Sequence, residues 1–123
     1  MKLEIICTRA EANHTQLLNC QATIESLDNG FQQMTKLLSI AGNEVRLKIL
    51  FLLNMEKELC PCDIADILKM SMPAISQHIR KIKDAGFIVS RREGQTLYYS
   101  LVNSETQVLD NILSSIKSSR KSA

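Results

Sequence analysis

Apolar residues recur at helical spacing in the first third of this chain. In residues 17–27 and 31–41 they fall every three or four positions, which is typical of helices with one apolar face. Asn29-Gly30 lies between the two stretches and predicts a helix stop or turn. We therefore expect an N-terminal arm with a possible helix at residues 1–30, followed by a helix that opens the main domain.

Two further apolar stretches predict the centre and the end of that domain. From Val45 to Leu53 the chain is apolar nearly all round, as expected of a buried helix. Asn43 is suited to cap this helix, which we expect to close at Asn54. In residues 108–116 the apolar positions form a single stripe at helical spacing. A helix with one apolar stripe needs a partner, so we expect it to pair across a two-fold axis in a homodimer.

Two short helices are predicted between these stretches. Asp63 is a good cap for a helix that ends at Leu68, and Ser71 is a good cap for a helix over residues 72–85. Gly86 then favours a helix end because glycine tolerates left-handed backbone. Two short helices joined by three residues indicate a helix-turn-helix.

The apolar period changes from 3.6 to 2 after Gly86. Residues 87–92 and 95–101 read as two strands joined by a Glu93-Gly94 turn, and a hairpin directly after a helix-turn-helix is a wing. The predicted fold class is mainly α with a small β-hairpin (α+β), a winged helix-turn-helix. The predicted organisation is an arm at 1–30, a DNA-binding and dimerisation domain at 31–117, and a disordered tail at 118–123.

Composition supports one soluble globular domain. The 123 residues are 45% hydrophobic and 23% charged, which excludes collagen-like and wholly disordered chains. No apolar run is long enough to span a bilayer, and Glu4 and Arg9 interrupt any signal peptide. We therefore expect a cytoplasmic protein whose thiols are reduced.

Charge is unevenly distributed, although the formal net charge is only +2. Residues 69–95 contain six Lys and Arg against two acidic residues, a net +4, whereas the rest has nine basic and eleven acidic residues, a net −2. On a helical wheel Met72, Ile75, Ile79 and Ile82 share the packed face, and His78 beside them is expected to be structural. Gln77 and Arg80 on the opposite face, with Ser76 on the flank, suit base and phosphate contacts. The predicted DNA-binding residues are Ser71, Pro73, Ser76, Gln77, Arg80, Lys81, Arg91 and Arg92.

Cys60 and Cys62 form the clearest candidate for a binding site. In extended backbone two such residues point to the same side, and a helix start lowers a thiol pKa, so the pair is suited to chelate a soft ion. A complete site needs more donors, for which Cys7 and Cys20 in the arm are the candidates. Asp63 could add an oxygen, but we favour its role as a helix cap.

Three motifs resemble the ArsR/SmtB family of winged-helix metal-sensing repressors, over about residues 31–117. Glu44 to Leu50 is similar to that family's R-L-x-I-L helix, and Glu58-Leu59-Cys60-Pro61-Cys62-Asp63-Ile64 to its E-L-C-V-C-D-L metal box. Ser76-Gln77-His78-Ile79 and Gly86-Phe87-Ile88-Val89 are similar to its S-x-H-L and G-L-V motifs.

The resemblance is closest to the cadmium/lead-sensing branch. It implies Cys60 and Cys62 as core ligands, joined by an arm cysteine, with Cys7 matching that pattern better than Cys20. An arsenic-sensing site would need Cys7 or Cys20 as its third sulfur. The family's alternative carboxylate and histidine site on the last helix is largely absent, because Asn103, Glu105, Ile116 and Ser119 stand there.

We therefore expect a metal-responsive transcriptional repressor that takes part in metal resistance and has no enzymatic activity. A homodimer would bind an inverted-repeat operator and release it when Cd, Pb, Hg, As(III) or Sb(III) binds the cysteines, and zinc could also be accommodated. No membrane or small organic substrate is expected as a partner. Two alternatives remain open: a repressor that senses oxidants or persulfides, for example through a Cys20–Cys60 disulfide, and a metal-buffering module without an operator.

Overall fold

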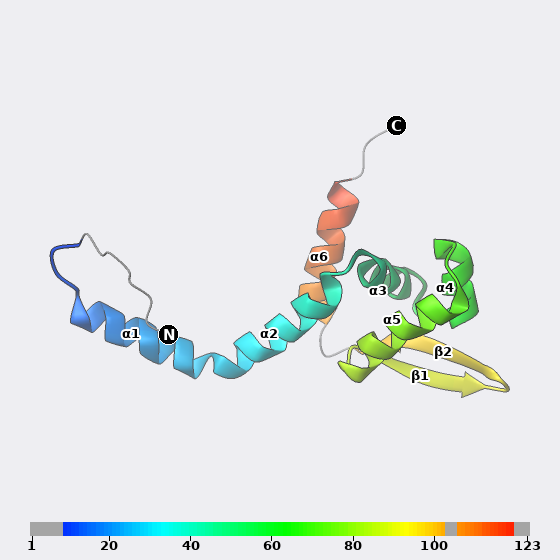
Figure 1. Cartoon of the computed structure of the whole chain (residues 1–123), viewed down its shortest axis with the longest axis horizontal. Coiled ribbons are helices and arrows are strands. Elements are labelled where there is room, and N and C mark those ends of the chain that lie inside the picture. The colour runs from blue at the N-terminus through cyan, green and yellow to red at the C-terminus, as the bar shows by residue number, and fades with distance from the viewer. Residues whose placement is uncertain (1–8, 103–105, 120–123) are drawn as a thin grey trace. The chain divides into compact units, whose positions relative to one another are not determined.

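The computed structural model describes residues 9–102 and 106–119 and divides the chain into two units, Met1–Met34 and Thr35–Ala123 (Figure 1). The first unit contains α1 (His14–Ser26) and the start of α2 (Asp28–Ala41). Asn13 caps α1, since its side chain accepts a hydrogen bond from the Gln16 amide at 3.0 Å. No side chain of α1 is buried.

The helix stop predicted at Asn29-Gly30 is wrong. Both residues lie inside α2, and the break between the two helices falls at Leu27. Asp28 lies in the first turn of α2, where a carboxylate is favoured, and its Oδ2 accepts a hydrogen bond from Gln32 Nε2 at 2.9 Å. This side-chain contact supports the first turn around Gly30.

The second unit is built around α3 (Glu44–Glu56). The predicted cap is confirmed, because the Asn43 side chain accepts a hydrogen bond from the Arg46 amide at 3.1 Å. The helix continues past Asn54, its expected end, and stops only at Lys57, whose φ is 71°. Ile49, Leu50 and Leu53 on this helix are fully buried, as the pattern predicts for a central helix.

The helix-turn-helix consists of α4 (Pro61–Leu68) and α5 (Met72–Asp84). Lys69 ends α4 in left-handed backbone, and Ser71 caps α5 by accepting a hydrogen bond from the Ala74 amide at 3.3 Å. The two helices contact each other, and α5 also contacts α3. Their buried side chains include Ile64, Ile75 and Ile82.

The wing, which is the hairpin of β1 (Ile88–Glu93) and β2 (Thr96–Leu101), follows directly after α5. The strands are antiparallel, with Ile88 opposite Leu101 and Arg91 opposite Tyr98, and the turn between them contains Gly94 at φ 62°. In Figure 1 the hairpin lies beside α5, and β2 also contacts α3 and α4. The predicted winged helix-turn-helix is confirmed.

The last helix, α6 (Thr106–Ser118), completes the core of the second unit. Leu109 and Leu113 are buried, whereas Ile116, at the end of the predicted stripe, is 41% exposed. No helix within residues 9–102 and 106–119 is long and apolar enough to cross a membrane.

Candidate nucleic-acid interface and thiol site

The α5 helix has a packed face and an open face. Ile75, Ile79 and Ile82 are buried, but Met72, which we expected on the same face, is 40% exposed because it lies at the free first turn. The predicted DNA-binding residues are all exposed: Ser71, Pro73, Ser76, Gln77, Arg80, Lys81, Arg91 and Arg92. The α5 helix therefore offers polar and basic side chains on the side opposite its core contacts.

A polar hollow of about 320 Å³ lies between α5, the start of α4 and β2. Its lining includes Pro61, Arg80, Lys83 and Tyr99. The Lys83 ammonium lies 6.0 Å from the centre of the Tyr99 ring and 3.4 Å from Ser90 Oγ. Side chains from α5, from the wing and from the start of α4 thus meet in one place.

Arg91 is exposed but already engaged. Its Nη2 lies 2.7 Å from Glu58 Oε1 and its Nε 3.0 Å from Glu58 Oε2, a bidentate ion pair, and Nη1 contacts Glu93 at 3.1 Å. The guanidinium also lies 5.0 Å from the centre of the Tyr98 ring. Hydrogen bonding to Arg91 lowers the pKa of Glu58 below its usual 4.5, and the two carboxylates raise the pKa of Arg91.

Glu58 is a residue that the sequence-based site did not include. It precedes Arg91 by 33 positions, so no local pattern relates the two. It lies in the thiol loop, residues 57–60, which connects α3 to α4. The one sequence signal for Glu58 is that it is the first residue of the metal-box motif, residues 58–64.

The thiol loop leads into a helix that starts earlier than expected. Cys60 is the helix cap, Pro61 is the first helical residue and Cys62 lies in the first turn. Asp63 is therefore not the cap that the sequence predicted. Instead, its Oδ2 accepts a hydrogen bond from the Cys60 amide at 3.4 Å. Proline is favoured at the first helical position because its missing N–H has no partner to lose there.

This local structure corrects two expectations about the thiols. Because Cys62 is helical, the same-side geometry of an extended Cys-Pro-Cys does not apply. The pKa of the Cys60 thiol is raised above its usual 9.0 rather than lowered. Partial burial of the thiol is the largest cause, and the Asp63 carboxylate raises the pKa further. These two effects outweigh the backbone amides of Asp63 and Cys62, which lower it.

The other two cysteine candidates belong to the N-terminal arm. Cys20 is exposed on α1, in the first unit, and Cys7 is outside the described residues. Cys20, Cys60 and Cys62 are free thiols. Among the described side chains, no three His, Cys, Asp or Glu residues are grouped so that they could hold a metal ion. The described thiol site therefore consists of the Cys60 and Cys62 sulfurs.

His78 lies on the inner flank of α5, as expected of a structural histidine. Its Nδ1 is buried and has no hydrogen-bond partner within the described part of the chain. Burial lowers the pKa of His78, and the positive charges of Arg46 and Lys81 lower it further. The imidazole is therefore neutral at neutral pH.

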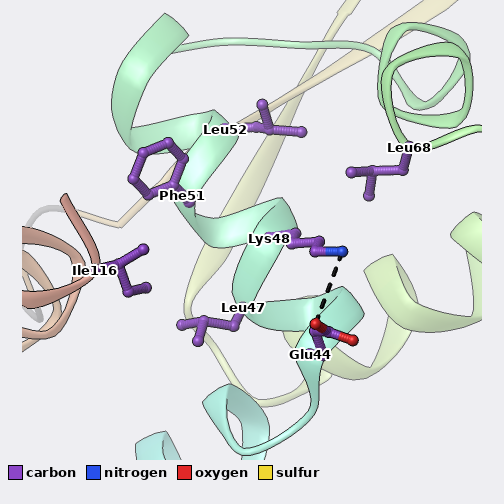
Figure 2. Close-up of a pocket in the computed structure, with 7 residues that line it drawn as sticks. All are labelled: Glu44, Leu47, Lys48, Phe51, Leu52, Leu68 and Ile116. Carbon is purple, nitrogen blue, oxygen red and sulfur yellow. Dashed lines mark ion pairs between the residues drawn. The ribbon is translucent and has the colours of Figure 1, made fainter. Parts of the chain in front are cut away.

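A second cavity, of about 350 Å³, lies between α3, the end of α4 and α6 (Figure 2). Figure 2 shows Leu47, Phe51, Leu52, Leu68 and Ile116 around it, with the Glu44–Lys48 ion pair, 3.9 Å long, at one side. The remaining lining is apolar. This cavity offers no sulfur or imidazole donor, so it is not a candidate for a soft-metal site.

Comparison with known proteins points to one family. Residues 43–90 match the model of a family described as bacterial regulatory protein, arsR family. The chain is 38% identical over 68 residues to the cadmium resistance transcriptional regulatory protein CadC homolog of Staphylococcus aureus, a match covering 55% of this chain and 56% of that protein. It is 31% identical over 104 residues to the transcriptional repressor SmtB homolog of Synechocystis sp., covering 85% of this chain and 77% of that protein.

Solved structures agree with the sequence matches. HlyU from Vibrio cholerae has a TM-score of 0.65 and 30% sequence identity with this chain, over 71% of this chain and 94% of that chain. Several of the curated relatives are matched over little more than half of their own length. The matched family and the matched fold are those of DNA-binding transcription regulators.

Proposed function

Because the chain belongs to the ArsR family of bacterial regulatory proteins, we propose that it is a cytoplasmic metal-responsive transcriptional repressor. It binds an inverted-repeat DNA operator and releases it when a thiophilic metal or metalloid binds its cysteines. The observation that carries this proposal is the juxtaposition of two thiols, Cys60 and Cys62, with a winged helix-turn-helix whose open face is basic. Relatives named for cadmium resistance and arsenic resistance support the choice of inducer class.

The α5 helix enters the major groove in this proposal. Gln77 and Arg80 lie on its open face and suit adenine and guanine, respectively, while Ser76 can reach base or phosphate. Lys81 and Arg92 would contact phosphates, Ser71 and Pro73 would lie near the DNA backbone at the first turn, and Arg91 would join them from the wing. Nothing in the buried set Ile75, Ile79 and Ile82 has to move for these contacts.

Two copies of the chain are needed for an inverted repeat. We expect α6 to pair with its counterpart about a two-fold axis, with the N-terminal arm adding to the interface. Ile116 on α6 is partly exposed in the single chain, which leaves apolar surface for such a contact. The two α5 helices would then enter successive major grooves roughly 34 Å apart.

The Cys60 and Cys62 sulfurs are proposed to hold the inducer, with a third donor from Cys7 or Cys20 of the same or the partner chain. Thiolates prefer soft ions, so Cd, Pb, Hg, As(III) and Sb(III) all suit the site and Zn can be accommodated. The raised pKa of Cys60 means that its thiol keeps its proton in the free protein at neutral pH. Cys60 must therefore lose a proton on binding, and its loop becomes fixed at the start of α4.

Release of DNA requires that inducer and operator binding oppose each other. A hundredfold loss of operator affinity corresponds to a coupling free energy of about 2.7 kcal/mol, which is within the usual allosteric range. Coordination by the thiolates can readily supply that amount. The thiol loop and the start of α4 are the parts of the chain that transmit it.

The experiment is a metal screen of DNA release by fluorescence anisotropy under reducing conditions, with the sulfur-to-metal charge-transfer band used to count thiolates. Cys60→Ser is the sharpest variant, because serine is also a good helix cap and preserves the start of α4. It should bind the operator like the wild type but lose inducer-driven release. Normal release by this variant would show that Cys60 is not a required ligand, and a wild type insensitive to every ion would overturn the proposal.

A redox signal is the second candidate, favoured by the exposure of the free Cys20 and Cys62 thiols. An oxidant or persulfide would then join distant cysteines in a disulfide and release the operator. Oxidant titration in chelator-containing buffer, followed by intact mass, separates the two candidates. Release without metal and with a mass loss of about two hydrogens per disulfide would favour the redox signal.

A further inference from the structure

Backbone hydrogen bonds join the thiol loop to the wing. Leu59 and Tyr99 exchange two hydrogen bonds, from the Tyr99 amide to the Leu59 carbonyl at 2.8 Å and from the Leu59 amide to the Tyr99 carbonyl at 3.1 Å. Leu59 therefore extends the β1–β2 hairpin by one bridge on the β2 side. The residue that makes this bridge is the immediate neighbour of Cys60.

Glu58 makes a second connection to the same hairpin through its side chain. The bidentate pair with Arg91 reaches β1, and Arg91 lies over the ring of Tyr98, its partner across the hairpin. Bidentate Arg–carboxylate pairs fix orientation as well as distance. Two consecutive residues of the loop, Glu58 and Leu59, thus hold both strands of the wing.

Backbone preference does not account for the position of the loop. Lys57, its first residue, has φ 71°, which residues other than glycine rarely adopt. Such a conformation persists where surrounding contacts impose it. Both ends of the loop are bonded to the adjoining helices, and its middle residues, Glu58 and Leu59, are bonded to the wing. We therefore expect movement of Cys60 and movement of the wing to be linked.

We propose that Glu58 is a positioning residue that couples the thiol site to the wing through Arg91. This inference rests on the proposed function and deepens it, because it names the route by which inducer at Cys60 and Cys62 changes DNA binding. While the pair is intact, a shift of the thiol loop moves Arg91 and the wing relative to α5. With the pair broken, Cys60 and Cys62 still bind the inducer, but Arg91 is no longer held to the loop and the wing follows only through the Leu59–Tyr99 bridge.

The chain supplies a matched control for this proposal. Glu93 also contacts Arg91, at 3.1 Å, but it lies on β1 two residues away and so makes no connection to the thiol loop. Glu58→Gln and Glu93→Gln remove the same charge from the same arginine. Only Glu58→Gln removes the side-chain ion pair between loop and wing, while the Leu59–Tyr99 backbone bridge remains in both variants.

The test measures operator affinity with and without Cd²⁺ by fluorescence anisotropy. We expect Cd²⁺ to lower the operator affinity of the wild type and of Glu93→Gln about a hundredfold. It should lower that of Glu58→Gln less than about tenfold. The charge-transfer band must show the same Cd²⁺ loading in all three proteins. The exchange Glu58→Arg with Arg91→Glu should restore the wild-type ratio, although its affinity for DNA is lower because the wing cation is gone.

A second measurement needs no metal. Because DNA binding engages the wing, operator DNA should change the exposure of Cys60, and so its rate of alkylation by iodoacetamide, at least twofold in the wild type and in Glu93→Gln, but by less in Glu58→Gln. If Cd²⁺ releases operator DNA from Glu58→Gln as fully as from the wild type, Glu58 does not couple the two sites. The same holds if Glu58→Gln and Glu93→Gln lose the Cd²⁺ response equally. Either result leaves the proposed function intact. A wild type that releases DNA with none of the thiophilic ions overturns the proposed function instead.

Discussion

Arg46 Nε donates a hydrogen bond to the Ile40 carbonyl at 2.9 Å, and so connects the start of α3 to the end of α2. Its Nη2 reaches the Ser39 carbonyl at 3.4 Å. Carbonyls in the last turn of a helix have no partner within the helix, and a cation there also meets the negative end of the helix dipole. The arginine of the R-L-x-I-L motif is thus a structural residue at a helix junction.

We predict that Arg46→Met lowers the free energy of unfolding by roughly 1.5 kcal/mol, because the charged hydrogen bond is lost while the side-chain stem is kept. Urea denaturation followed by circular dichroism measures this. Lys48→Met is the control on the same helix. Its ion pair with Glu44 is 3.9 Å long and exposed, so the change should be below about 0.5 kcal/mol. Equal effects of the two variants would contradict the role of Arg46.

The stability of the protein should decrease at acidic pH partly because of His78. Its folded-state pKa is below the usual 6.5, as burial, Arg46 and Lys81 all disfavour the imidazolium. The unfolded chain therefore binds a proton first as the pH falls, and stability present above pH 6.5 is lost below it. Urea denaturation between pH 7.5 and about 5 should show a smaller decrease in His78→Gln than in the wild type.

His14 is exposed on α1 and provides the control for this measurement. His14→Gln replaces a histidine in the first unit by the same residue and is measured over the same pH range for comparison. Replacing Arg46 by Met removes one of the charges that act on His78, so the decrease should also be smaller in that variant. If His78→Gln and the wild type lose the same stability, the neutral imidazole is not a source of the pH dependence.

The packed face of α5 should dominate the stability of the helix-turn-helix. Ile75 is fully buried, so Ile75→Ala removes buried methyl groups and leaves a cavity, with an expected cost of about 2–4 kcal/mol. Met72 is 40% exposed on the same helix, and Met72→Ala should cost less than about 1 kcal/mol. Chemical denaturation distinguishes them, and a large cost at Met72 would show that it packs in the assembled protein.

Base-reading and phosphate-binding residues should respond differently to salt. Arg80→Ala should cost about 1–3 kcal/mol of operator binding and relax base preference at one position of each half-site. Lys81→Ala should weaken all sequences about equally and reduce the slope of log affinity against log salt by about one per binding site. Anisotropy titrations at several salt concentrations, on operator and scrambled duplexes, test both. Identical behaviour of the two variants would contradict the assigned roles.

Local signals predicted most of the fold. The caps at Asn43 and Ser71 are confirmed because each side chain bonds an amide three residues later, which is a purely local event. The change of apolar period after Gly86 is also a local signal, and it located the wing correctly. Boundaries were less well predicted where two signals compete, as at Cys60 and Asp63. There, proline at the first helical position outweighs the capping tendency of Asp63.

The candidate site was predicted in part. The exposed face of α5 follows from a helical wheel, because one helix fixes which residues share a face. The Glu58–Arg91 pair and the Leu59–Tyr99 bridge join residues 33 and 40 positions apart, so they depend on tertiary structure that no sequence period encodes. The raised pKa of Cys60 also depends on burial, which outweighs the favourable position at a helix start.

The bridge between Leu59 and Tyr99 leaves the two sides of the hairpin unequally protected. Within the described residues β2 is covered on its far side at that point, whereas β1 pairs with β2 alone and keeps an unpaired outer edge. Free edges of this kind invite strands from other molecules, and charged side chains discourage them. Arg91 and Arg92 belong to β1, so neutralising both in a test of DNA binding would also remove charges that discourage aggregation.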